Sequence, residues 1–131
     1  MAENSITFGD GSVILLEKEK LQESAIIIKI KNKTNIESII TSDYDNFSFI
    51  DVLKIYRHKS FTVYIGEGSY GGDGFIYLTD NKSSELVWFA FFDFSDPFVD
   101  VIINNDQIIT TTNNDRNWTF LLKNPELINV E

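Results

Sequence analysis

The feature that most constrains the fold is a series of short apolar segments in the second half of the chain. They are rich in β-branched and aromatic residues, which favour strands, and the links between them carry Gly, Asn, Asp and Pro, which favour turns. Because short links join neighbouring strands, this half predicts an antiparallel β meander of six or more strands. The segments lie at residues 61–65, 75–78, 86–92, 98–103, 107–112 and 118–122.

Residues before 61 give weaker signals. Residues 13–16 are apolar and residues 25–31 are strongly β-branched, so both predict strands. A candidate hairpin partner for the second strand lies at residues 36–40, across a turn at residues 32–35.

Helical signals are confined to two parts of this region. Residues 17–24 could form two turns, and residues 44–58 fit neither period, although their residue types favour a strand. We therefore predict a mainly β fold, with α+β as the alternative, and at most one or two short helices. The sheet is expected to be curled or a partial barrel, and the sequence does not separate a barrel from a sandwich.

The chain is long and apolar enough for one core. It has 131 residues, of which 43% are hydrophobic, so we predict a single domain over residues 1–131. No apolar run approaches the roughly 18–20 residues that cross a bilayer. Residues 1–5 lack the features of a secretory signal, and the absence of cysteine fits a reducing compartment. We therefore expect a cytoplasmic protein without membrane contact.

Charge is distributed unevenly along the chain, whose net charge is −9. Residues 1–65 contain eight Lys/Arg and nine Asp/Glu, whereas residues 66–131 contain three and eleven. Eleven of the eighteen aromatic residues also lie in the second half. An acidic, aromatic-rich half repels nucleic acid and attracts basic partners, although acidity that only maintains solubility is the alternative.

The residue types that carry most enzyme chemistry are scarce. His58 is the only histidine and there is no cysteine, which excludes a structural zinc site. The glycine-rich residues 66–74 match G-x-G-x-x-G, but a dinucleotide site needs a following helix and here a strand follows, so we interpret them as a turned link or binding loop. We expect no enzymatic activity, no cofactor and no metal. The enzymatic alternative is a hydrolase or lyase with two acids in one cleft.

Acidic side chains form the most suggestive group. Three follow the segment at residues 86–92 closely, and two more belong to the glycine-rich link. Together they predict an acidic binding face, with a charged loop at a strand end as the alternative. We predict partner contacts at Glu67, Tyr70, Asp73, Asp93, Asp96 and Asp100.

Asp100 differs from the others because it lies within a predicted strand. Alternation places it on the same face as Phe98 and Ile102. We therefore expect its carboxylate to be either exposed among apolar neighbours or paired with a cation. A partly exposed apolar face with one acid is typical of an interface.

Three other groups have structural interpretations. Trp88 and Trp118 lie inside predicted strands, so we expect both in the core with their indole N–H groups bonded to a carbonyl or water. Lys29, Lys31 and Lys33 alternate along one segment. They predict an edge strand whose lysines hinder pairing with another sheet.

Five segments in the second half carry a family resemblance. They are residues 66–75 (GEGSYGGDGF), 88–92 (WFAFF), 95–98 (SDPF), 118–120 (WTF) and 124–125 (NP). Over about residues 61–125 this combination resembles small immunity proteins encoded beside bacterial polymorphic toxins, in contact-dependent inhibition and related systems.

The resemblance implies a cytosolic, non-enzymatic, acidic protein that neutralises its cognate toxin by direct binding. The implied partner is a basic toxin domain. The alternative is a β-sheet ligand-binding or scaffold module for a peptide or sugar, with a concave pocket lined by Trp88, Trp118 or Tyr77. A homodimer is a further alternative, because an exposed apolar face could also bind a second copy of the chain.

Overall fold

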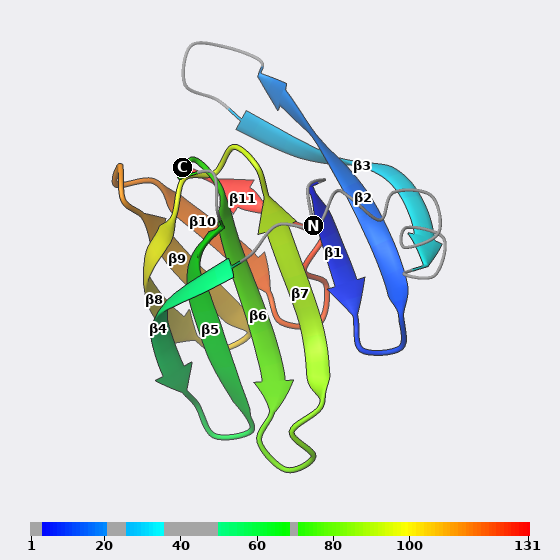
Figure 1. Cartoon of the computed structure of the whole chain (residues 1–131), viewed down its shortest axis with the longest axis vertical. Coiled ribbons are helices and arrows are strands. Elements are labelled where there is room, and N and C mark those ends of the chain that lie inside the picture. Colours follow the sequence, from blue (N-terminus) through cyan, green and yellow to red (C-terminus); the bar gives the residue numbers. More distant parts are fainter. Residues whose placement is uncertain (1–3, 21–25, 36–49, 69–70) are drawn as a thin grey trace.

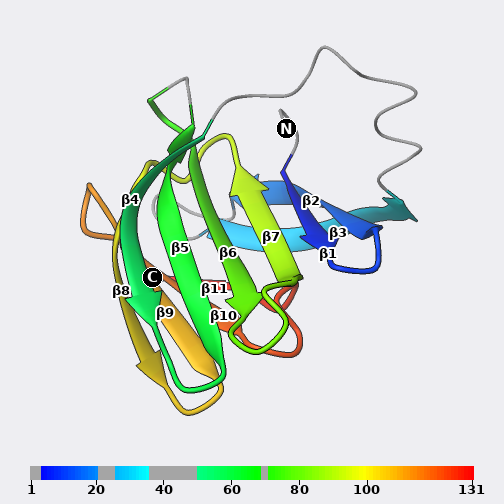
Figure 2. The same ribbon diagram turned by 60° about the horizontal axis from the view of Figure 1, so that its bottom comes forward.

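A computed structural model of the chain describes residues 4–20, 26–35, 50–68 and 71–131 (Figures 1 and 2). Within these residues it contains eleven strands and no helix, and the strands form two antiparallel sheets that do not close into a barrel. The prediction of a mainly β, antiparallel fold is confirmed. None of the described segments is a helix long and apolar enough to cross a membrane.

The larger sheet has seven strands in the order β3-β2-β1-β7-β6-β5-β4. The central strand is β7, whose sequence is apolar on both faces and whose residues are all buried or half-buried. The edge strands are β3 and β4. The bounds are β1 Ser5–Phe8, β2 Ser12–Lys20, β3 Ile26–Asn35, β4 Ile50–Arg57, β5 Phe61–Gly68, β6 Gly74–Asp80 and β7 Leu86–Phe92.

The smaller sheet has four strands in the order β11-β10-β9-β8 and lies behind β4–β7 in Figure 1. Its bounds are β8 Phe98–Asn104, β9 Gln107–Thr112, β10 Asn117–Leu121 and β11 Asn129–Val130. The core between the two sheets is aromatic. It includes Trp88, Phe92, Phe98, Trp118 and Phe120, each at most 1% exposed.

The core positions of both tryptophans are therefore confirmed. The Trp88 indole Nε1–H donates to the Leu122 carbonyl oxygen at 2.9 Å, as expected. The corresponding atom of Trp118 is buried and has no hydrogen-bond partner among the described residues. The rings of Phe92 and Trp118 come from different sheets and lie 4.8 Å apart between centroids, so they join the two layers.

The six strands predicted between residues 61 and 122 correspond to β5–β10, but they do not form one meander. The link at residues 93–97 carries the chain from the larger sheet to the smaller one. Asp96 has a positive φ of 68°, and its backbone N–H donates to the Gly72 carbonyl oxygen at 2.9 Å. Sequence could not show this crossing, because a hairpin and a sheet-to-sheet link can have the same length.

The N-terminal half differs more from its prediction. Residues 17–20 belong to β2 rather than to a helix, and residues 32–35 belong to β3 rather than to a turn. The two strands pair with each other, with Glu17 opposite Lys29, and this pairing overrides the local signals. The strand favoured after residue 44 is confirmed as β4. Other parts of these predictions lie outside the described residues, at residues 21–24, 36–40 and 44–49.

Candidate binding surface

The structure does not expose all of the residues predicted as partner contacts. Asp73 is fully buried, and its Oδ1 accepts a hydrogen bond from the Gly68 backbone N–H at 3.0 Å. A Cβ at Gly68 would lie 2.3 Å from Asp73 Oδ2, so this close packing requires glycine. Gly68 and Asp73 are therefore held together through a buried carboxylate, which a partner cannot reach. Tyr70 lies outside the described residues.

The other predicted acids outside β8 lie near the ends of β5 and β7. Asp93 is exposed, and its backbone N–H donates to Asn4 Oδ1 at 2.7 Å, just before β1. Asp96 Oδ2 accepts a hydrogen bond from Asn114 Nδ2 at 2.9 Å, and Glu67 is half-buried in β5. The three carboxylates therefore lie at the same end of the larger sheet, where β5 and β7 end and β6 begins, whereas Asp100 lies on β8.

Asp100 on β8 forms an ion pair with Lys54 on β4, which bridges the two sheets at their edges. A β-bulge at Val99 shifts the register between Phe98 and Asp100. Phe98 is therefore buried, whereas Asp100 and Ile102 are exposed. The predicted shared face with Ile102 is confirmed and that with Phe98 is wrong, because the bulge breaks the alternation. The hydrogen bond from Lys54 lowers the pKa of Asp100, so its carboxyl is ionised at neutral pH.

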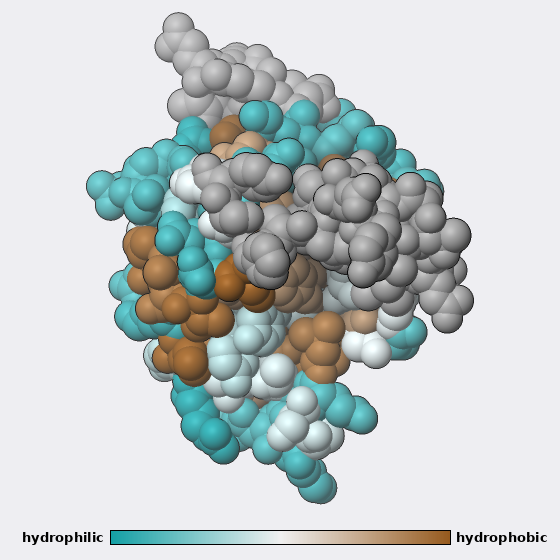
Figure 3. Space-filling model, in the orientation of Figure 1, coloured by the Kyte–Doolittle hydropathy of each residue, from teal (hydrophilic) through white to brown (hydrophobic). Residues whose placement is uncertain are grey.

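Around this ion pair lies a group of exposed apolar side chains, which we call the β4–β8 surface. All eight residues of β4 are exposed, and β4 contacts β8 along one side of the sandwich. Its most exposed members are Ile55 at 59% and Ile102 at 61%. Figure 3 shows apolar side chains gathered as a brown area where β4 lies in Figure 1. The full set is Ile50, Val52, Leu53, Ile55 and Tyr56 on β4 with Val99 and Ile102 on β8.

A second bulge, at Leu53, decides where the side chains of β4 point. Beyond it, Lys54 stands opposite Ile65, a core residue, and therefore lies on the face toward β8. Ile55 stands opposite the half-buried Tyr64 and lies on the outer face of the larger sheet. Side chains of β4 therefore lie on both faces of the sheet at this edge.

On the outer face, the β4–β8 surface continues as a row of aromatic rings. The strand register places Ile55, Tyr64, Tyr77 and Phe89 opposite one another on β4, β5, β6 and β7. The rings of Tyr64 and Tyr77 have centroids 4.5 Å apart and planes 11° from parallel, and those of Tyr77 and Phe89 are 5.6 Å and 25° apart. Rings so close and nearly parallel overlap face to face, so the row presents ring edges and few open ring faces.

The environment of the row also keeps its central phenol neutral. Burial raises the pKa of Tyr77, and the neighbouring Tyr64 adds to this effect. An ionised phenolate would lose hydration and meet a second phenol at short range. At neutral pH, Tyr77 therefore contributes a hydrogen-bonding hydroxyl and no charge.

The β4–β8 surface was not predicted from the sequence. Bulges at Leu53 and Val99 break the two-residue period on which strand faces are assigned. One sequence signal does point to this surface. Apolar residues occur at adjacent positions in β4, so the hydrophobic pattern there does not follow the two-residue period of a strand. The apolar sequence of β7 on both faces was a second signal, because it requires an outer face that is not simply polar.

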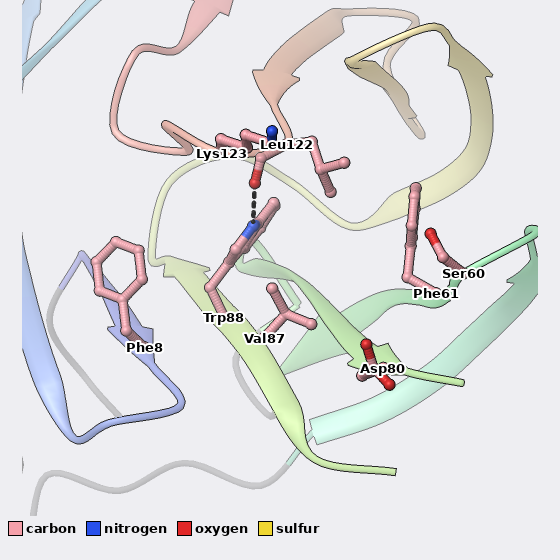
Figure 4. Close-up of a pocket in the computed structure, with 8 residues that line it drawn as sticks. All are labelled: Phe8, Ser60, Phe61, Asp80, Val87, Trp88, Leu122 and Lys123. Atoms are coloured by element: carbon pink, nitrogen blue, oxygen red, sulfur yellow. Dashed lines mark hydrogen bonds between the residues drawn. The ribbon is translucent and has the colours of Figure 1, made fainter. Parts of the chain in front are cut away.

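A cavity separate from this surface lies at one end of the sandwich, with a volume of about 340 Å³ (Figure 4). Trp88 lines it, as the ligand-binding alternative expected, whereas Trp118 and Tyr77 are not among its lining residues. Elsewhere in the described part of the chain, no three His, Cys, Asp or Glu side chains are placed to hold a metal ion.

The chain was compared with known protein families, curated proteins and solved structures. No family model matches the chain, and no curated protein or solved structure matches it significantly.

Proposed function

We propose that this chain is a small acidic immunity protein, which neutralises a bacterial toxin by binding it directly through the β4–β8 surface. The observation that carries this proposal is the group of exposed apolar side chains on the neighbouring strands β4 and β8, in which Ile55 lies opposite the first ring of the aromatic row. A sheet that faced only solvent would carry polar residues at these outer positions. An apolar area with few charges is typical of the centre of a protein–protein interface.

A protein partner fits the aromatic row better than a sugar or a nucleic acid does. Sugars and bases that bind aromatic side chains stack on open ring faces. Here Tyr64 and Tyr77 cover each other's faces, so a ligand would meet mainly ring edges. The side chains of a folded partner can pack against such edges as they do in a protein core. The net charge of −9 also repels nucleic acid.

The proposed partner is basic because of the charge of the whole protein rather than of the surface itself. Within the β4–β8 surface, the Lys54–Asp100 pair is neutral overall. The excess negative charge lies outside it and acts over a distance of about 8–10 Å in physiological salt. Long-range attraction would speed the encounter with a basic toxin, and apolar contacts would supply most of the affinity.

The test is a pull-down of the purified protein with the product of the gene immediately upstream, at low and high salt, combined with a toxicity assay on co-expression. We expect a tight complex that abolishes toxicity and associates more slowly as salt rises. A neighbouring product that is not toxic, or a complex that leaves toxicity intact, would show that the immunity proposal is wrong.

A matched pair of variants ties the complex to the proposed surface. Ile55 and Leu127 are both 59% exposed, but only Ile55 belongs to the β4–β8 surface. Ile55→Glu places a charge in the interface and should weaken binding by at least about tenfold. Leu127→Glu should leave binding within about twofold. Equal effects of the two variants would move the interface elsewhere.

A further inference from the structure

The cavity at the end of the sandwich has an apolar middle and two polar ends. It lies where β1 and β6 end, β5 and β7 begin, and the chain leaves β10. Its apolar lining consists of Phe8, Phe61, Val87, Trp88 and Leu122. A volume of about 340 Å³ is at the small end of the range for ligand sites in proteins.

Local backbone features hold this lining in place. Gly9 donates its backbone N–H to the Val87 carbonyl oxygen at 3.2 Å, and a Cβ at Gly9 would lie 2.1 Å from the Leu86 carbonyl oxygen. Only glycine therefore lets the β1–β2 turn approach β7 so closely and bring Phe8 to the cavity. The Trp88 indole is held by its bond to Leu122, which Figure 4 shows at the centre of the site.

The two charged residues lie at opposite ends. Figure 4 shows Asp80 and Ser60 toward one end and Lys123 at the other, with Val87 and Trp88 between them. Asp80 Oδ1 accepts hydrogen bonds from the backbone N–H groups of Lys82 and Ser83, both at 2.9 Å. These bonds lower the pKa of Asp80 and fix its carboxylate. Every hydrogen bond to this carboxylate among the described residues uses Oδ1, so Oδ2 is the atom available to a ligand.

We propose that this cavity binds a linear ω-amino carboxylate, the chemistry of a C-terminal lysine residue. The ligand's ammonium group would pair with Asp80, its methylene chain would lie against Trp88 and its neighbours, and its carboxylate would pair with Lys123. A molecule with a single charge would leave one end unpaired. The proposal does not rest on the immunity function, because the cavity is separate from the β4–β8 surface.

The test follows the Trp88 indole N–H resonance of the full chain during titration with small probes. We expect 6-aminohexanoate and Nα-acetyl-lysine to shift this resonance at millimolar concentration. Hexylamine, hexanoate and Nα-acetyl-lysinamide each lack one charged group and should bind at least about tenfold more weakly. A preference for Nα-acetyl-lysine would assign the ligand to a protein C-terminus, and one for 6-aminohexanoate would assign it to a free amino acid. No shift with either probe would overturn the proposal.

Two variants test the ends of the cavity separately. Asp80→Asn removes the charge but keeps an Oδ1 acceptor for the turn, and Lys123→Gln changes an exposed side chain, so both should fold. Each should weaken 6-aminohexanoate binding by about tenfold. The matched controls Asp93→Asn and Lys33→Gln remove charges from exposed residues that do not line the cavity and should change it less than about twofold. Binding that survives both cavity variants unchanged would show that the probes bind elsewhere.

Discussion

The two edge strands of the larger sheet, β3 and β4, expose different side chains to solvent. On β3, Lys29, Lys31 and Lys33 are all exposed, and Lys31 lies at a bulge, so the predicted edge strand with lysines is confirmed. Charged side chains and bulges are the usual protection of a sheet edge against another strand. On β4, by contrast, most exposed side chains are apolar, including Leu53 and Ile55.

The edge of β4 is nevertheless protected against strand addition. It has a bulge at Leu53, and Lys54 points inward to Asp100. Both features disturb the straight, uncharged edge that another strand would need. A partner would therefore contact the side chains of β4 and would not form backbone hydrogen bonds with it. This difference between the edges supports the proposal that a partner packs against β4 rather than against β3.

The largest expected effect concerns folding, and it tests whether the apolar side chains of β4 serve the core. Trp88→Ala removes a residue that is 1% exposed and should lower the free energy of unfolding by about 3–5 kcal/mol. Ile55→Ala should lower it by no more than about 0.5 kcal/mol. Urea denaturation of both variants measures this. A large loss for Ile55→Ala would make β4 part of the core and remove the contrast between the edges.

The second effect concerns partner binding, and it compares the edges directly. Leu53→Glu on β4 should weaken the complex with the toxin by about thirtyfold, which corresponds to about 2 kcal/mol. Ile30→Glu on β3 is the matched control, because Leu53 is 48% exposed and Ile30 is 45% exposed. We expect the control to stay within about twofold in isothermal titration. A stronger effect of Ile30→Glu would place the partner on β3.

The third effect concerns aggregation. The double substitution Lys31→Val and Lys33→Val removes two charges from the β3 edge and should make the protein aggregate faster. Light scattering during incubation at fixed concentration measures the rate. Lys59→Val, which removes an exposed lysine outside both edge strands, is the control. Equal rates for the double variant and wild type would contradict the protective role of the β3 lysines.

The smallest effect concerns the Lys54–Asp100 pair. The folded-state pKa of Asp100 lies below its unfolded value, so the pair stabilises the protein above about pH 4 and loses this effect as pH falls through the folded pKa. Both side chains are about half exposed, at 44% and 54%, so Lys54→Met should cost less than about 1 kcal/mol at pH 7. The cost should shrink as pH falls below about 4 and through the folded pKa, as measured by urea denaturation at a series of pH values. A cost that does not change with pH would belong to packing and not to charge.

The strands of the second half were predictable from sequence because their residue types and their turns agree. The pairing of β2 with β3 was not, because Glu17 and Asn32 sit in strands against their local preferences and are held there by cross-strand neighbours. The division into two sheets depends on the conformation of Asp96, which no pattern in the sequence specifies. Strand propensity is local, whereas sheet order depends on contacts between distant residues.

The candidate site was less predictable than the fold. Acidic residues suggested one face, but the structure buries Asp73 and pairs Asp100 with Lys54. The β4–β8 surface was not predicted because the bulges at Leu53 and Val99 change which side chains are exposed. A bulge is set by the pairing of two strands, so a single sequence does not show it.

The most direct test of the binding account is hydrogen–deuterium exchange of the protein alone and in complex with the toxin. We predict that the partner slows exchange at residues 50–57 and 98–103, which carry the β4–β8 surface, and leaves β3 unchanged. Protection at β3, or at neither edge of the larger sheet, would contradict the claim that β4 and β8 form the binding surface.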